Sequence, residues 1–258
     1  MSTTGPSHAL DFIKNVDLPD EPNFAIEKAG DAPPLPTYGN QDQAVAVGSQ
    51  IAEFSARVPA ALRPAISNSF LLAQLAADKE LTKKAGNGLS WYAKYNEVLA
   101  NVGWVIEGSA SNFKEITGTK LHVHEEILPV IAAVLGPAAA AASIIATTLK
   151  GLQAMNKDSP WITLFDRESQ RAKANQFQLA YVDAPDAKAP VMKLASFELD
   201  ASGSVTQVLF FKFGTQKASL KHNSTTLSVN AGIFDAVQGA VQQKVATFLT
   251  GKVAALDI

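Results

Sequence analysis

The densest group of side chains that could do chemistry lies near the middle of the chain, in the run His122-Val123-His124-Glu125-Glu126. Histidine nitrogens and carboxylate oxygens are common zinc ligands. The zinc-helix motif HExxH would need a histidine at position 128, where Leu128 stands. On a strand, His122 and His124 would share one face and could bind a metal as a pair. Because the sequence offers no evident third ligand, solvated or helix-capping histidines are the alternative interpretation.

Other patterns typical of enzymes are incomplete. The glycines around Asn87 lack the third glycine and the preceding strand of a dinucleotide site. Gly251-Lys252 is followed by Val253, which lacks the hydroxyl that a phosphate-binding loop places on magnesium. The chain has no cysteine, so thiol catalysis, disulfides and thioester-linked lipids are excluded. We therefore expect no enzyme activity and no catalytic residues.

Composition describes an ordinary globular chain of 258 residues, 47% of them hydrophobic, which can bury a large core. A net charge of -2 gives no general attraction to nucleic acid, so we expect no nucleic-acid partner. Residues 1–40 are rich in proline and predict an extended arm, with a short strand at 24–26. The N-terminal sequence has no Sec-type signal pattern, so export would use another route.

The elements that must position these residues begin with an uncharged stretch from Ile127 to Leu149. As one helix it would be roughly 34 Å long at about 1.5 Å per residue, close to the thickness of a bilayer core. Gly136-Pro137 predicts a bend or a break into two helices. Core helices of a globular domain are the favoured interpretation, and a membrane segment is the alternative.

Hydrophobic periodicity predicts helices at 41–58, 64–81, 90–105 and 231–250. After residue 152 the pattern changes to alternation, which predicts strands at 177–181, 193–200, 205–213 and 218–229, with a hairpin turn at 201–204. The expected organisation is an arm at 1–40 and one domain at 41–258, with helices at 41–153, a β-meander at 175–229 and a C-terminal helix. The fold class is α+β, an antiparallel sheet of about four to six strands wrapped by helical hairpins.

The order of these elements resembles a known family. Helical hairpins, then Pro160-Trp161-Ile162, then a meander centred on the run Val208-Leu209-Phe210-Phe211-Lys212-Phe213 and ending at Val229, are similar to the Cyt class of insecticidal cytolysins. A volvatoxin-type fungal cytolysin and the Erwinia virulence factor share that fold. The resemblance covers residues 42–250 in element order, and at residue level only the Trp161 region and residues 193–229.

The resemblance implies a pore-forming toxin or virulence factor that is soluble at first, then binds the lipid membrane of a target cell and self-associates there. It would be made in the cytoplasm and released without a Sec signal. The alternative is a non-lytic lipid-binding factor of the same fold, with a non-covalently bound lipid or fatty acid instead of another cofactor. The implied membrane-interacting residues are Val205, Val208, Leu209, Phe210, Phe211 and Phe213, with Leu194, Phe197 and Leu199 beside them. An ordinary sheet core is the alternative role of the same side chains.

Overall fold

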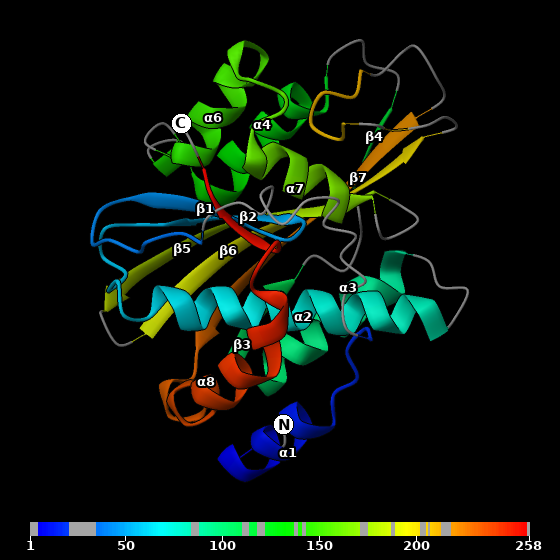
Figure 1. Cartoon of the computed structure of the whole chain (residues 1–258). Helices are drawn as coiled ribbons and strands as arrows, with labels where there is room; N and C mark the ends of the chain where they lie inside the picture. Colours follow the sequence, from blue (N-terminus) through cyan, green and yellow to red (C-terminus); the bar gives the residue numbers. More distant parts are fainter. Residues whose placement is uncertain are drawn as a thin grey trace.

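A central β-sheet lies between two layers of helices in the computed structural model of the chain (Figure 1). The structure describes residues 5–20, 35–83, 88–109, 114–117, 122–136, 139–140, 143–170, 175–186, 189–201, 205, 207–212 and 218–256. The predicted strand at 24–26 falls outside these ranges. The α+β class and the helix-covered, mostly antiparallel sheet are confirmed.

The described part of the sheet has eight strands, more than the expected four to six. Seven follow the order β3-β7-β6-β5-β2-β1-β8, and β4 also pairs with β7. Their bounds are β1 Gln43–Val47, β2 Gln50–Phe54, β3 Trp104–Ser109, β4 Lys114–Thr117, β5 Gln176–Asp186, β6 Ala189–Ala201, β7 Ala218–Val229 and β8 Val253–Ala255. The pairs are antiparallel except for β2 with β5, which is parallel. The predicted strands at 177–181, 193–200 and 218–229 correspond to β5, β6 and β7.

The first helical layer covers one face of the sheet (Figure 1). It comprises α1 Pro6–Asn15, α2 Arg63–Lys83, α3 Gly88–Asn101 and α8 Ala231–Val245, followed by the short η2 Ala246–Phe248. The helices predicted at 64–81 and 231–250 are present, and the one predicted at 90–105 ends earlier. The N-terminal arm is not simply extended, because Pro6 begins α1 and Ala9 and Ile13 bury its inner side.

The second helical layer covers the opposite face (Figure 1). It comprises α4 Val123–Leu135, α6 Ile144–Gly151 and α7 Pro160–Ser169, with η1 Leu152–Ala154 between the last two. The uncharged stretch is divided after Leu135, as predicted, and it lies in the core through side chains such as Ile127, Ile131 and Leu149. Within the described ranges, no helix has both the length and the apolar character needed to cross a bilayer.

The helix predicted at 41–58 is wrong, because this segment forms the β1–β2 hairpin. Gly48 and Ser49 join the two strands, and Gly48 has a φ of 55°. A Cβ at Gly48 would lie 2.5 Å from Oε1 of Gln74, so both the turn and the close approach of α2 require glycine. With β3 and β4, this hairpin places four strands in a region that was expected to consist of helices and the loop 108–118.

Candidate functional site

The apolar segment at 205–212 was expected to be a strand and is not one. Among its described residues only Lys212 makes a β-bridge, to His122. Val208 and Leu209 are fully buried, Val205 is nearly so, and Phe210 and Phe211 are half-buried. The strand prediction failed because helices, rather than neighbouring strands, form hydrogen bonds with the backbone N–H and C=O groups of this segment. Phe213 lies outside the described residues.

Two helices of the second layer hold the 205–212 segment in place. The Val208 N–H donates to Oδ1 of Asp166 on α7 over 2.8 Å. The carbonyl of Leu209 accepts from the backbone N–H of His124 over 3.1 Å, and the carbonyl of Phe211 accepts from that of Val123 over 2.9 Å. Segment 205–212 is therefore fastened to the first turn of α4 and to the middle of α7.

The predicted membrane-interacting residues on β6 do not share one face. Successive side chains of a strand point to opposite faces, so Leu194 lies against the first helical layer, while Phe197 and Leu199 lie against the second. Phe197 stacks on Phe177 of β5, with ring centroids 4.9 Å apart and planes 11° apart. Phe165 of α7 meets the Phe177 ring edge-on at 5.7 Å. The structure thus groups most of the predicted residues, without Leu194, around an aromatic column under α7.

Opposite this column, the other face of the same strands carries a polar row that sequence reasoning missed. The register aligns one polar residue from each of four neighbouring strands, namely Gln50, Gln178, Ser196 and Asn223. The Tyr95 hydroxyl of α3 donates to Oε1 of Gln50 over 2.7 Å. Gln50 and Gln178 are fully buried, and the side-chain amide of Gln178 has no hydrogen-bond partner within the described ranges. The signal was the alternation Gln176-Phe177-Gln178-Leu179, which marks a strand with one polar and one apolar face.

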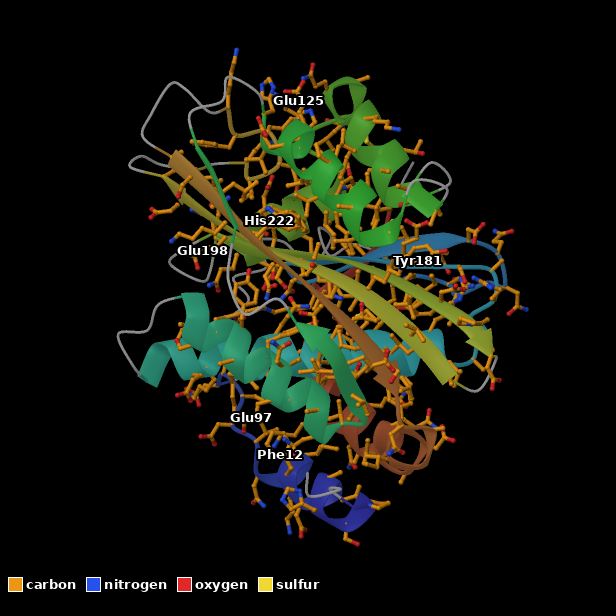
Figure 2. The ribbon with its side chains drawn as sticks, turned by 180° about the vertical axis from the view of Figure 1, so that it is seen from behind. Phe12, Glu97, Glu125, Tyr181, Glu198 and His222 are labelled. Atoms are coloured by element: carbon orange, nitrogen blue, oxygen red, sulfur yellow. The ribbon has the colours of Figure 1, made fainter. Side chains whose placement is uncertain are left out.

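A second polar row lies one step further along the strands. Gln176, Glu198 and Lys221 are aligned by the register, and Lys221 Nζ lies 3.2 Å from Oε1 of Glu198. Figure 2 shows the positions of Glu198 and His222 on β6 and β7. At this end of the sheet, β5 and β6 are therefore polar toward the first helical layer and apolar toward the second, whereas β7 turns His222 and Ser224 as well as Leu220 toward the second.

Ionisable side chains connect the second layer to the sheet. Glu53 of β2 is buried, and its carboxylate accepts from the Ser143 hydroxyl over 2.6 Å and from the backbone N–H groups of Ile144 and Ile145 over 2.9 Å each. This carboxylate caps the N-terminus of α6, where the helix dipole favours negative charge. Lys193 of β6 donates to the carbonyl of Leu135 at the end of α4 over 3.1 Å.

Asp166 is a second ionisable contact of this layer. Burial raises the pKa of its carboxyl to about 7, because a charged carboxylate is poorly solvated there, and the hydrogen bond from Val208 opposes this only in part. The group therefore titrates near neutral pH although it is an aspartate.

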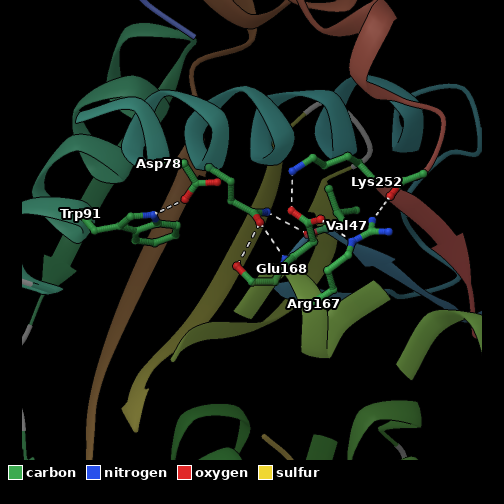
Figure 3. Close-up of polar contacts among 9 residues, drawn as sticks. Val47, Asp78, Trp91, Arg167, Glu168 and Lys252 are labelled. Atoms are coloured by element: carbon green, nitrogen blue, oxygen red, sulfur yellow. Dashed lines mark hydrogen bonds and ion pairs between the residues drawn. The ribbon is translucent and has the colours of Figure 1, made fainter. Parts of the chain in front are cut away.

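A buried ion pair fastens α7 to the C-terminal end of the chain. Lys252 pairs with Glu168, and both side chains are almost fully buried (Figure 3). Glu168 also accepts from Nε of Arg167. On the first-layer side, a neutral contact joins α2 to the β1–β2 hairpin: Gln74 accepts from the backbone N–H of Ser49 over 2.9 Å and donates to the Val47 carbonyl over 2.9 Å.

His122 and His124 are brought together, and Glu125 joins them. One candidate ligand atom from each residue lies within 4.8 Å of the other two. The two rings stack with centroids 5.3 Å apart. His122 is the N-cap of α4, and its backbone N–H donates to Oε2 of Glu125 over 2.7 Å. This contact lowers the pKa of the Glu125 carboxyl.

Cavities give little room for a lipid beside α4 and α6. The hollow lined by Ile131, Leu135, Ile145 and Tyr181 holds about 10 Å³. An acyl chain needs far more space, since a hollow of this size has room for about one water molecule. A larger hollow of about 340 Å³ lies between α1, α2 and α3, and its lining includes the charged side chains Asp11, Lys79, Glu80 and Lys94.

Comparisons with known proteins give structural matches at low sequence identity. No protein-family model and no curated protein matches the chain. Among solved structures, a delta-endotoxin matches with 14% identity and a TM-score of 0.40, over 74% of this chain and 89% of that one. The activated Cyt2Ba monomer from Bacillus thuringiensis subsp. israelensis matches with 12% identity and a TM-score of 0.38, over 70% and 96%. The Evf virulence factor matches with 10% identity and a TM-score of 0.27, over 96% and 91%. In fold, the chain is similar to Cyt delta-endotoxins and to the Evf virulence factor.

Proposed function

We propose that the chain is a membrane-binding toxin or virulence factor. In this proposal the second helical layer moves away from the sheet, the exposed apolar face contacts a lipid bilayer, and several copies associate into a pore. The observation that carries the proposal is the two-sided character of β5 and β6 at their Gln176 end, where a buried polar row lies on the face opposite an aromatic column.

A sheet that is covered by helices on both faces normally has apolar side chains on both. Burying the amide of Gln178 without a partner costs about 1–3 kcal/mol. The same alternation suits a sheet with lipid on one side and water on the other. The polar row therefore fits a second, membrane-bound arrangement better than it fits a permanently covered sheet.

Strand length and charge support the same proposal. The strands β5, β6 and β7 contain 11, 13 and 12 residues, and a tilted strand that crosses the hydrocarbon core needs about 9–11. In lipid every backbone polar group must be paired, so the strand edges would have to meet other copies of the chain. The net charge of -2 offers no general attraction to anionic headgroups, which leaves apolar contact as the main source of binding.

A reversible lock tests whether α4 has to separate from segment 205–212. His122 and Lys212 are partners in an antiparallel bridge, so the variant His122→Cys/Lys212→Cys places two cysteines opposite each other in a chain that otherwise has none. We expect the oxidised variant to release no dye from phosphatidylcholine liposomes, and reduction to restore leakage to the wild-type rate.

The matched control locks a pair within the sheet. Val105 and Ser228 are partners on β3 and β7, and Val105→Cys/Ser228→Cys should leak equally in its oxidised and reduced forms. No leakage from the wild-type protein over a range of lipids and pH values would overturn the pore-forming proposal. Co-flotation with the liposomes without leakage would instead favour the non-lytic lipid-binding alternative.

A further inference from the structure

We propose that His122, His124 and Glu125 form a binding site for a divalent transition metal ion, for which Zn²⁺ is the best match. The three candidate ligand atoms lie within 4.8 Å of one another at the start of α4. Two imidazole nitrogens and one carboxylate oxygen are a ligand set that zinc binds readily, with a fourth position left for water. Figure 2 shows Glu125 on the second-layer side of the molecule, opposite Phe12 and Glu97 of the first layer.

The hydrogen bond of His124 prepares this residue as a ligand. Its Nδ1 lies 2.8 Å from the carbonyl oxygen of Leu209. A carbonyl can only accept, so Nδ1 carries the proton and Nε2 of the neutral ring carries the lone pair. Metal-binding histidines commonly donate their second ring nitrogen to a backbone carbonyl in this way, which fixes the orientation of the ring. Since His124 is also buried, its ring is held before a metal arrives.

The other two candidate ligands, His122 and Glu125, contact each other. Nδ1 of His122 lies 3.3 Å from Oε2 of Glu125, and this carboxylate oxygen also accepts from the backbone N–H of His122. Nδ1 of His122 also lies 3.5 Å from the side-chain amide nitrogen of Gln153, which can only donate, so the carboxylate favours a protonated Nδ1 and the amide an unprotonated one. In either tautomer one nitrogen of the neutral ring keeps a lone pair for a metal. Both side chains are about one-third exposed, at 29% for His122 and 35% for Glu125, which leaves a path for the ion.

A metal at this position would act on the joint between α4 and segment 205–212. The joint consists of the hydrogen bonds to Leu209 and Phe211 and of the bridge from His122 to Lys212. A ligand that binds only the closed arrangement stabilises it in proportion to RT ln(1 + [L]/Kd). Zinc would therefore resist the separation of α4 from this segment.

The test uses the full chain after removal of bound metals with a chelator, and no lipid is present, so its outcome is independent of the membrane proposal. Calorimetric titration with Zn²⁺ should give one ion per chain, and the melting temperature should rise with the Zn²⁺ concentration. Titration with Co²⁺ should produce the visible absorption of a four-coordinate site. Absence of stoichiometric binding of either ion would overturn the proposal.

Variants locate the site. His122→Asn, His124→Gln and Glu125→Gln should each weaken Zn²⁺ binding by about tenfold or more, because each removes one ligand. His8→Asn is the matched control, since His8 lies exposed on α1, and it should bind as the wild type does. If His124→Gln does not fold, the variants at His122 and Glu125, which are about one-third exposed, still decide the outcome. Unchanged affinity in His122→Asn and Glu125→Gln would show that the ion binds elsewhere, against the proposal.

Discussion

The two helical layers are attached to the same sheet by different chemistry. Neutral side chains attach most of the first layer, through the Gln74 amide to β1, the Tyr95 hydroxyl to β2 and the Tyr92 hydroxyl to β6. A charged side chain, the buried Arg63 of α2, also attaches this layer, but it donates to neutral oxygens such as Oε1 of Gln43. Ionisable side chains attach the second layer, through Glu53 to α6 and Lys193 to α4. Attachment by charged groups depends on pH and salt, whereas attachment by neutral hydrogen bonds does not. The comparison identifies the second layer as the one that a change of environment can loosen.

The largest effect that tests this comparison is expected at the buried pair of Glu168 and Lys252. Lys252→Met removes the cation that is buried against the Glu168 carboxylate, which should lower the free energy of unfolding by about 3–5 kcal/mol in urea denaturation. The double variant Glu168→Met/Lys252→Met should recover most of the loss, because no uncompensated charge remains.

The control for this prediction is an ion pair at the surface. Arg57 is paired with Asp183, and its side chain is 61% exposed. Arg57→Gln should change the free energy of unfolding by less than about 1 kcal/mol. If Lys252→Met and Arg57→Gln lowered the free energy of unfolding equally, the buried pair would contribute no more to stability than the surface pair, against this prediction.

Glu53 gives the next effect. Glu53→Gln keeps the shape of the side chain but removes the charge that faces three donors at the start of α6. We expect a loss of about 2–3 kcal/mol, the range for hydrogen bonds to a charged group, in the same urea experiment. Amide exchange in α6 should accelerate more than in α2, and acceleration in both helices alike would argue against a separate second layer.

Asp166 gives a pH dependence with a definite sign. Its pKa is raised from 3.8 to about 7 in the folded protein, so the folded state binds this proton more tightly than the unfolded chain does. The free energy of unfolding should therefore fall as the pH rises from about 4 to about 7. Asp166→Asn should remove this slope and stabilise the protein at pH 8, measured as a shift of the urea midpoint to higher concentration. A wild-type profile that rises over this range would contradict the assignment.

Tyr95 should give the smallest effect, and one that does not depend on pH. Tyr95→Phe removes the hydroxyl that donates to Gln50 and should cost about 1 kcal/mol. Urea midpoints at pH 5 and pH 8 should shift by the same amount. If the loss of unfolding free energy in Tyr95→Phe varied with pH, the two layers would not differ in the pH dependence of their attachment.

The sequence predicted those elements in which polar and apolar residues still recur with the period of a strand or a helix. The strands β5, β6 and β7 were found because polar and apolar residues alternate along them, and the division of the long apolar stretch was found at Gly136-Pro137. The β1–β2 hairpin was missed because Val45, Ala46, Val47 and their neighbours are buried on both faces, which removes the alternation and leaves a pattern that also fits a helix.

The candidate site was predicted only in part, because the pairing register of the strands determines which side chains lie side by side. The sequence grouped His122 with His124, but Glu125 joins them only through the turn that begins α4. Leu194 was grouped with Phe197, but the two residues are an odd number of positions apart on β6, so their side chains point to opposite faces of the sheet. The alignment of Gln50 with Gln178 and Ser196 depends on which strands are neighbours, and no local pattern contains that information.

The parallel pairing of β2 with β5 has a consequence for how the chain acquires its shape. At this junction the Ser55 hydroxyl meets Asp183 across 128 positions of sequence, and the last strand, β8, closes against β1. Contacts so distant in sequence carry a large loop-closure entropy and slow folding. During synthesis the early hairpin must wait for more than a hundred further residues before its permanent neighbour exists. We therefore expect a single late, cooperative folding step rather than independent folding of the two halves.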